Sequence, residues 1–355
     1  MFVSTFPDTG PFSNHWSVPI TTSGERPRCI IVHDKTPSVA DHLPNLAQEW
    51  NILAQVPLMA GESSKNLETL VQLWDAFNLA QADRETNIIC IGGGSLCDLV
   101  GFAAGTYHRG LPLVFAPTTA LAMVDAAIGG KNGINWRGAK NQLGMLHHPK
   151  QIVVEYRWLE TLGRVERLSG WIEMAKHAFT ESREVAEAFL LETEPTLDAF
   201  SRWIPRAASY KWNIVNQDPE EMGLRKVLNF GHTVGHALEA LGTTPETHMP
   251  HGIAVAWGME TALRMSVSLR GMEREEARRA AERLRHWLHP APAPGWEAER
   301  VWPWMLKDKK NKGGQVLEVL LDAWGKPVWD CAVTFPEFAR AWEATRDAGD
   351  WGSSN

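Results

Sequence analysis

The sequence has few cysteines and no long apolar run, and both shortages narrow the class of protein. Four cysteines are scattered over 355 residues without a CxxC pair, which excludes a disulfide-stapled scaffold and a zinc ribbon. No run of roughly 18 apolar residues is present, so we expect no membrane contact. The first residues lack the basic and apolar regions of a signal peptide, so we expect a cytoplasmic protein.

Positive charge is also in short supply. The chain has 35 Lys and Arg against 42 Asp and Glu, a formal net charge of −7. A general nucleic-acid-binding protein would show a basic stripe and a high pI, so we expect no nucleic-acid partner, while the charge balance still allows a local basic pocket. The apolar share of 44% is that of a globular protein, which excludes disorder, and the length predicts two domains.

The first half of the chain alternates strand-like and helical segments. Strand-like runs lie at 29–34, 54–60, 87–94, 111–119 and 151–156, and helical patterns at 37–54, at 65–82 and from within 95–108. This alternation predicts an α/β fold with a parallel sheet over residues 1–160. After about residue 160, the segments 169–182, 184–215 and 227–241 show helical periodicity, which predicts a mainly α-helical domain over 161–355.

A glycine-rich turn, Gly92-Gly93-Gly94-Ser95, follows the strand-like run at 87–91, and a helix is expected to begin near Asp98. Glycines at such a turn let backbone N–H groups and a helix N-terminus approach a pyrophosphate. The spacing is not GxGxxG, and glycine-rich turns are common, so this turn taken alone is a weak signal and more often a plain turn than a nucleotide site. Upstream, 61–65 could contact a ribose or simply begin a helix.

Two histidines point to a metal site. His232 and His236 are four residues apart in a helical pattern, with Glu239 further along the same face. Paired histidines of this spacing suit a divalent cation, and His251 could return as a ligand after a loop. A histidine pair without metal is the alternative. Glu173 is the best carboxylate candidate, although a Glu three residues before Lys176 is usually an exposed ion pair.

Glycine-embedded cations mark a third segment, 124–144. It contains Asp125, Lys131, Lys140 and Asn141 among glycines and apolar residues. Lysines without acidic neighbours indicate an anion pocket. Further cations that could join it are Arg109, Lys211, Arg225 and the run Lys307-Asp308-Lys309-Lys310, although each by itself is more often a solvated side chain.

Taken together, these segments resemble the 3-dehydroquinate synthase family of sugar phosphate cyclases over roughly residues 25 to 325. The strongest stretches are GGGSLCDLVGFAAGTYHRG, APTTALAMVDAAIGGKNGIN, GAKNQLG, SGWIEMAKHAF, GLRKVLNFGHTVGHALE and LKDKKN. Several ordered motifs at compatible spacing are far more specific than any one of them. The resemblance implies a Rossmann-like NAD-binding domain followed by a metal- and substrate-binding domain, in a homodimer.

The resemblance also implies site residues. Glu173, His232 and His251 resemble the ligands of a zinc or cobalt ion, with His236 contacting substrate instead. The implied NAD-binding residues are Asp34, Glu62, Lys65, Gly93, Gly94, Ser95, Asp98, Thr118, Thr119, Asp125, Lys131, Lys140 and Thr161. The implied catalytic residues are Asp125, Lys131, Lys176, Arg225, Asn229 and His236, and the implied substrate-binding residues are Lys140, Asn141, Lys211, one of Lys309 or Lys310, and Arg109 from the partner subunit.

The activity implied is conversion of 3-deoxy-D-arabino-heptulosonate 7-phosphate to 3-dehydroquinate and phosphate, a step of the shikimate pathway. Oxidation, phosphate elimination, reduction and aldol closure would occur in one site, and NAD would be regenerated. The sequence departs from the commoner family wording at Ala126-Ala127, where serines are frequent, at Asn132, where threonine is usual, and at Ile253, where glutamate is usual. The last change removes a carboxylate beside an implied metal ligand.

Three other functions are weighed against this one. A metal-dependent alcohol or glycerol dehydrogenase shares the two-domain design but has no need for the lysine and arginine set. Another sugar phosphate cyclase shares nearly every motif, although the GGK, GAKN and LRKVLNFGH segments favour the quinate branch. A non-catalytic homologue would have lost ligands or lysines, and all of them are present in this chain.

Overall fold

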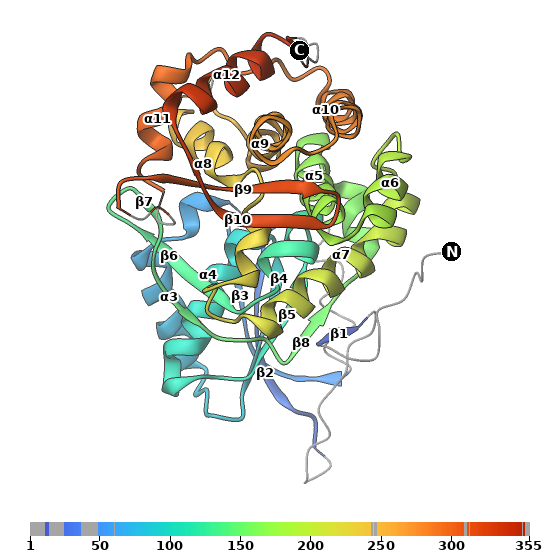
Figure 1. The fold of residues 1–355 in the computed structure, drawn as a ribbon. Helices are drawn as coiled ribbons and strands as arrows, with labels where there is room; N and C mark the ends of the chain where they lie inside the picture. The colour runs from blue at the N-terminus through green and yellow to red at the C-terminus, as the bar shows by residue number, and fades with distance from the viewer. Residues whose placement is uncertain are drawn as a thin grey trace. The chain divides into compact units, whose positions relative to one another are not determined.

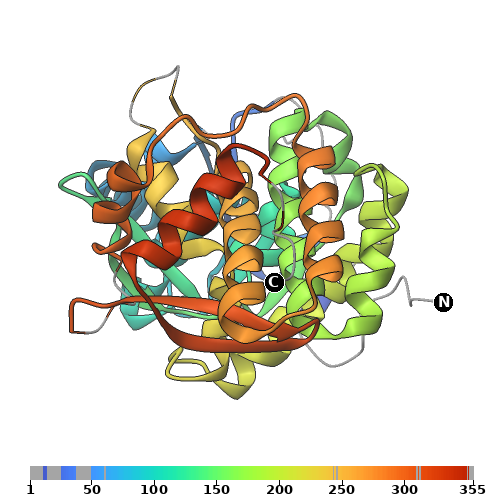
Figure 2. The same ribbon diagram turned by 45° about the horizontal axis from the view of Figure 1, so that its top comes forward.

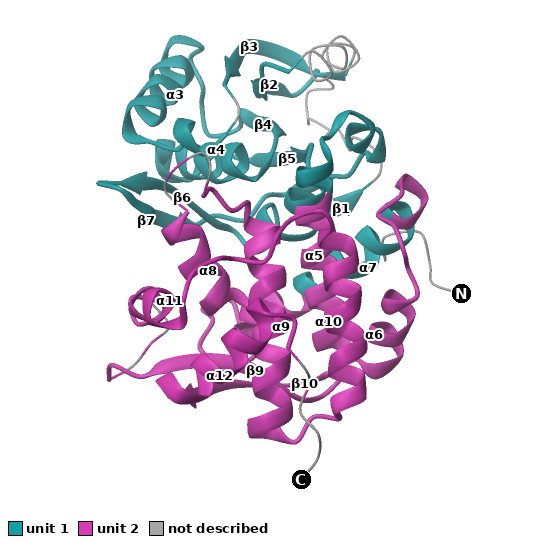
Figure 3. Ribbon diagram, turned by 90° about the horizontal axis from the view of Figure 1, so that it is seen from above, with its two compact units in different colours: residues 1–167, 200–212 teal, residues 168–199, 213–355 magenta. Residues whose placement is uncertain are grey.

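The computed structural model describes residues 11–13, 25–36, 49–59, 61–242, 244, 247–308, 311, 313–349 and 351. The chain divides into two compact units, residues 1–167 with 200–212 and residues 168–199 with 213–355 (Figure 3). The division into domains after residue 160 stays a prediction, because compactness alone does not identify independently folding segments. No helix in the described ranges is long and apolar enough to cross a membrane.

The first unit is built on a six-stranded parallel sheet in the order β1-β8-β5-β4-β2-β3 (Figure 1). The strands are β1 (Phe12–Ser13), β2 (Arg28–Asp34), β3 (Asn51–Leu58), β4 (Asn87–Gly92), β5 (Leu113–Pro117) and β8 (Gln151–Val153). The central strands β4 and β5 are buried along their whole length, as their unbroken apolar runs predict. The predicted α/β fold with a parallel sheet is confirmed.

Chain order places a binding edge on this sheet. From β2 the chain passes to β3 at the sheet edge and returns through α3 (Leu67–Leu79) to β4 on the other side of β2. Helix α4 (Gly94–Thr106) then leads to β5. Ligands of such sheets bind at the carboxyl ends of the strands where the direction of winding reverses, here between β2 and β4.

Two expectations for the first unit need correction or completion. The helical pattern at 37–54 is wrong for residues 51–54, which belong to β3 and pair with β2, so strand pairing overrides local periodicity; residues 37–48 lie outside the described part. The lysine-bearing segment forms an antiparallel hairpin of β6 (Lys131–Trp136) and β7 (Ala139–Leu146). Shorter turns complete the unit: η1 (Glu62–Ser64), η2 (Tyr107–Arg109), η3 (Ala122–Ala126) and η4 (Tyr156–Thr161).

The second unit is mainly helical, in line with the periodicity after residue 160. Its elements are α5 (Arg164–Glu181), which begins in the first unit, α6 (Arg183–Leu190), both ends of α7 (Leu197–Gln217), η5 (Leu224–Asn229), α8 (His232–Leu241), α9 (His251–Arg270), α10 (Arg274–Leu288), α11 (Ala298–Met305) and α12 (Phe335–Arg346). A hairpin of β9 (Val316–Ala323) and β10 (Lys326–Val333) was not predicted from the sequence. Helix α9 packs against α8, α10, α12 and β9, and Figure 2 shows α10 and α12 beside it.

Glycines bring α8 and α9 unusually close together. A Cβ atom on Gly258 of α9 would lie 2.0 Å from the carbonyl oxygen of Gly231, and one on Gly235 of α8 would lie 3.1 Å from the Cα atom of Val255. Gly231, which caps α8, also has a positive φ of 75°. The close spacing of these two helices therefore requires residues without a side chain at the contact.

We expect Gly258→Ala to destabilise the protein by about 1–3 kcal/mol, because the added methyl group meets backbone that cannot move independently. Urea-induced unfolding followed by tryptophan fluorescence measures the change. Gly295→Ala is the matched control, since a Cβ atom there meets nothing within 4 Å. Equal stability of the two variants would show that the helices separate without cost.

Candidate active site

In the first unit, the predicted nucleotide-binding residues gather at the carboxyl ends of three adjacent strands. Asp34 ends β2, Gly92 ends β4, and Thr118 follows β5 directly. The Thr118 N–H donates to the Gly92 carbonyl oxygen at 3.0 Å, which ties two of these strand ends together. Parallel pairing thus brings residues up to 84 positions apart in sequence to one edge of the sheet.

The glycine turn is close to its neighbours, which explains its composition. Gly93 is the N-cap of α4, and a Cβ atom on it would lie 3.2 Å from the Thr119 methyl carbon. A Cβ atom on Gly94 would lie 2.9 Å from the Cβ atom of Ala126. The turn leaves the N-terminus of α4 without a side-chain cap, so its backbone N–H groups are suited to an anionic ligand.

A polar network surrounds this turn. Glu62 accepts hydrogen bonds from Ser95 Oγ and Asn135 Nδ2, each at 2.8 Å. The buried Lys65 ammonium donates to Asp98 Oδ2 at 2.6 Å. Four of these five residues were predicted to bind NAD, and Asn135 was missed because it lies in the hairpin, 73 positions from Glu62.

The Asp98 carboxyl is unusual in its acidity. Burial raises its pKa, and the Lys65 ammonium offsets only part of this effect, so the pKa reaches about 6. A carboxyl with this pKa carries a proton over part of the neutral range, and it could donate a hydrogen bond to a ligand oxygen.

The other predicted residues of the first unit are placed as follows. Lys211, on the part of α7 that belongs to this unit, donates to the side chain and the carbonyl oxygen of Asp125 at 2.6 and 2.7 Å. Lys131 is exposed at the start of β6, Lys140 and Asn141 are exposed on β7, Arg109 ends η2 with a positive φ of 66°, and Thr161 ends η4.

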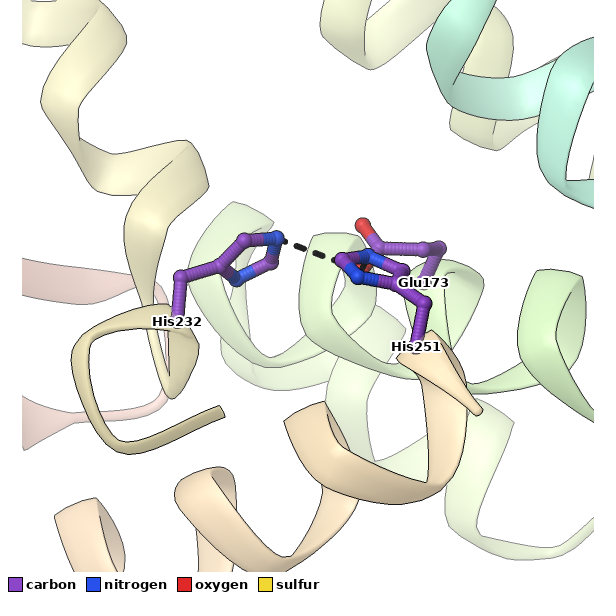
Figure 4. A group of neighbouring side chains, drawn as sticks. All are labelled: Glu173, His232 and His251. Carbon is purple, nitrogen blue, oxygen red and sulfur yellow. Dashed lines mark ion pairs between the residues drawn. The ribbon is translucent and has the colours of Figure 1, made fainter. Parts of the chain in front are cut away.

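The second unit brings three predicted metal ligands together. Glu173 comes from α5, His232 from the first turn of α8 and His251 from the first turn of α9, and their side chains converge (Figure 4). Glu173 Oε1 lies 3.5 Å from His232 Nε2 and 3.4 Å from His251 Nε2. One ligand atom from each residue lies within 4.8 Å of the others.

The cluster fits a divalent metal ion on three grounds. Ligands bound tetrahedrally to zinc at its usual distances lie roughly 3.4 Å from one another, which matches the two measured separations. Among the described residues, neither oxygen of the buried Glu173 carboxylate has a hydrogen-bond partner of good geometry. Two imidazoles and one carboxylate are also a common ligand set of catalytic zinc.

Charge explains how Glu173 is tolerated in the interior. Burial would raise its pKa, but the Lys176 ammonium and the His251 imidazole lower it well below the usual range. Lys176, one turn further along α5, forms an ion pair with it, and both side chains are at most 1% exposed. This pair is therefore buried and not the exposed surface pair that is usual at this spacing.

His251 is affected in the opposite direction. Burial lowers its pKa, but contacts with the Glu173 and Glu239 carboxylates outweigh burial and raise the pKa to about 10. His251 Nδ1 lies 3.2 Å from Glu239 Oε2. A metal ion would therefore replace a proton at this cluster, as metal binding generally does.

The remaining predicted residues of the second unit lie on η5 and α8. The Arg225 guanidinium donates to the Pro219 carbonyl oxygen at 2.8 Å, and Asn229 Nδ2 donates to Glu221 Oε1 at 2.7 Å. His236 lies outside the ligand cluster, with its ring centroid 5.4 Å from that of His232 and its Nδ1 3.5 Å from Asp308 Oδ2. Lys309 and Lys310 lie outside the described residues.

Sequence reasoning missed the residues that hold these groups in place. Asp218 accepts hydrogen bonds from the backbone N–H groups of Met222, Gly223 and Arg225 and so orders the turn before η5. Asp308, next to the predicted lysines, faces His236. An Asp followed by a turn and a Gly is a sequence signal that could have identified Asp218. The contact of Asp308 with His236 depends on tertiary structure and has no such signal.

The raised pKa of Asp98 predicts a pH dependence of stability. Because its folded-state pKa of about 6 exceeds the usual 3.8, stability from this group is full below pH 3.8 and is lost as pH rises to about 6. Asp98→Asn should gain stability relative to wild type over this range, by at most about 1.4 kcal/mol per pH unit.

Urea unfolding at several pH values measures the difference. Asp83→Asn is the control, because a hydrogen bond from the Thr86 side chain lowers the Asp83 pKa. The contribution of Asp83 to the free energy of unfolding is therefore lost only below pH 3.8, outside the range tested. A constant difference between Asp98→Asn and wild type from pH 4.5 to 6 would contradict the raised pKa.

Comparison with known proteins identifies the family of this chain. Residues 55–169 match the model of the 3-dehydroquinate synthase N-terminal domain, and residues 170–311 match that of the C-terminal domain. A 3-dehydroquinate synthase of Parabacteroides distasonis is 35% identical over 264 residues, which are 74% of this chain and 75% of that protein.

Two solved structures share the fold. A 2-epi-5-epi-valiolone synthase from Streptomyces hygroscopicus with NAD⁺ and Zn²⁺ bound is 25% identical, with a TM-score of 0.78 over 93% of this chain and 94% of that one. A 2-deoxy-scyllo-inosose synthase complexed with carbaglucose-6-phosphate, NAD⁺ and Co²⁺ is 22% identical, with a TM-score of 0.79 over 90% of each chain. The resemblance inferred from the motifs is confirmed, and the chain belongs to the 3-dehydroquinate synthase family.

Proposed function

We propose that this enzyme is a 3-dehydroquinate synthase, which converts 3-deoxy-D-arabino-heptulosonate 7-phosphate to 3-dehydroquinate and phosphate. The observation that carries the proposal is the convergence of Glu173, His232 and His251 beside a buried lysine, in a chain that matches both domains of that family. A non-catalytic homologue would have no need to bury a charged cluster of this kind, because isolated buried charge is costly.

The metal site would be formed by Glu173, His232 and His251, and the ion by analogy with the two solved relatives would be zinc or cobalt. When bound there, the ion supplies Lewis-acid polarisation of a substrate hydroxyl. The chain's own contribution is to hold three ligand atoms at fixed separations from three different helices.

NAD would bind at the carboxyl edge of the parallel sheet in the first unit. The glycine turn leaves room for a pyrophosphate at the N-terminus of α4, and Asp34, at the end of β2, would face the adenosine end. Glu62, Lys65 and Asp98 would order the remaining polar contacts. When bound there, NAD would supply reversible hydride transfer and would not be consumed.

Fixed cations of the second unit would stabilise negative charge as it develops on the substrate. The Lys176 ammonium is held beside the metal ligands by its ion pair with Glu173, so it needs no reorganisation during reaction. Arg225 is held by the Pro219 carbonyl oxygen and by the Asp218 turn, a geometry suited to a substrate carboxylate. His236, near Asp308, would relay protons to and from the substrate.

The first unit also carries residues with proposed roles toward substrate and cofactor. Asp125 orients the Lys211 ammonium through two short hydrogen bonds. Lys131, Lys140 and Asn141 lie on the hairpin and would contact the anionic groups of substrate and cofactor. In the proposed homodimer, Arg109 would reach the phosphate from the partner subunit.

One prediction of the proposed function concerns the reaction itself. With NAD and zinc or cobalt supplied, the enzyme should release inorganic phosphate from the heptulosonate phosphate without net accumulation of NADH, because the hydride returns within one turnover. Phosphate release and absorbance at the nicotinamide band are followed in the same cuvette. Phosphate release accompanied by a stoichiometric amount of NADH would contradict the proposal. Absence of phosphate release would contradict it as well.

The same assay separates the alternatives. A sugar phosphate cyclase of another branch would release phosphate from sedoheptulose 7-phosphate or glucose 6-phosphate but not from the sugar acid. A polyol dehydrogenase would accumulate NADH from glycerol and release no phosphate. The solved cyclase relatives favour testing the first of these alternatives before the second.

Another prediction of the proposed function concerns the metal. Glu173→Gln should lower zinc content after dialysis by at least about tenfold, because a neutral amide replaces the carboxylate ligand while side-chain size is kept. Metal content is measured by elemental analysis, with circular dichroism as the test of folding. Full metal occupancy in a folded Glu173→Gln protein would remove Glu173 from the ligand set.

A further inference from the structure

Each of the two histidines of the cluster makes a contact through Nδ1, the ring nitrogen that does not face Glu173. Both present Nε2 toward Glu173, which leaves Nδ1 of each ring pointing elsewhere. His232 Nδ1 lies 3.2 Å from the carbonyl oxygen of Phe230, and His251 Nδ1 lies 3.2 Å from Glu239 Oε2. Each ring therefore has an acceptor for a proton on Nδ1.

This pairing fixes the form of each ring. A neutral imidazole that donates from Nδ1 keeps a lone pair on Nε2, which is the form that binds a metal ion. A carboxylate acceptor also makes the ring a stronger ligand than a carbonyl acceptor does. The acceptor for His232 is backbone, whereas the acceptor for His251 is a side chain that can be replaced.

The helices α8 and α9 bring Glu239 to His251. Glu239 lies two turns after His232 on α8, so one helix carries a ligand and the acceptor for another ligand. His251 begins α9, and the glycine contacts between Gly231 and Gly258 hold the two helices close. The Glu239 side chain is 15% exposed and that of His251 27%, so their contact is partly shielded from water.

We propose that Glu239 is a positioning residue for the metal centre: it holds His251 in the Nδ1–H form and in the orientation that presents Nε2 to the ion. The proposal rests on the metal site of the proposed function. Position 253, the second residue after His251 in α9, is isoleucine and supplies no carboxylate of its own. Glu239 thus provides from α8 a carboxylate that the start of α9 lacks.

The test is the zinc affinity of the folded protein, measured by competition with a chromophoric chelator. Glu239→Ala should weaken zinc binding about 10- to 100-fold, as loss of such an outer carboxylate usually does. Glu239→Gln keeps an acceptor oxygen without the charge and should fall between Glu239→Ala and wild type. Glu282→Gln, on the exposed face of α10, is the control and should bind zinc as wild type does.

A double-mutant cycle distinguishes positioning from a general effect on the fold. If Glu239 acts through His251, Glu239→Gln should change zinc affinity less than twofold when His251→Ala is already present. In the His232→Ala background it should keep its full effect. The absorption spectrum of the Co²⁺-loaded protein should also shift in Glu239→Gln, because the orientation of His251 at the ion changes.

Two results would overturn the proposal, and they are distinguishable. Wild-type zinc affinity in both folded Glu239 variants, with His232→Ala still weakened, would overturn the role of Glu239 and leave the metal site of the proposed function standing. Absence of zinc and cobalt binding by the wild-type protein would overturn both.

Discussion

The burial of a single carboxylate sets the requirements for the second unit. Glu173 is fully buried, and an isolated charge in that position would cost several kcal/mol. Its compensation comes from three sources of positive or polarisable charge, namely Lys176 on its own helix and an imidazole from each of α8 and α9. A site that must supply cationic partners to one buried carboxylate is also suited to a divalent ion, which gives the structural cluster a chemical use.

The packing of the surrounding helices follows from this requirement. Histidines from two helices reach one oxygen of Glu173 only if the start of each helix lies close to α5, and glycines at the α8 and α9 contact allow this approach. Helix α9 is in turn anchored away from the cluster, where the buried Glu260 accepts hydrogen bonds from Arg264 and Arg285. Rigid support of this kind keeps ligand atoms at fixed separations, which a catalytic metal site needs.

The first unit shows how a similar problem is solved without a buried metal cluster. In the proposed NAD site, an anionic ligand at the sheet edge would meet backbone N–H groups at the start of α4, where glycine leaves room for close approach. The polar side chains around it already bond to one another, Glu62 with Ser95 and Lys65 with Asp98. Orientation before ligand binding lowers the entropy cost of forming the site.

The sequence by itself determined the α/β class, the glycine turn and the family, because strand periodicity and ordered motifs are local properties. The identity of the three clustered side chains came from the resemblance to that family, since spacing alone pairs His232 with His236, which lies outside the cluster. Tertiary structure decided that residues 51–54 form a strand, that Lys131 and Lys140 share a hairpin, and that the pair of Glu173 and Lys176 is buried. It also decided that Glu239 faces His251, since α8 and α9 meet through glycine contacts. Spacing along a chain reports which side chains share a face, and only packing reports what that face meets.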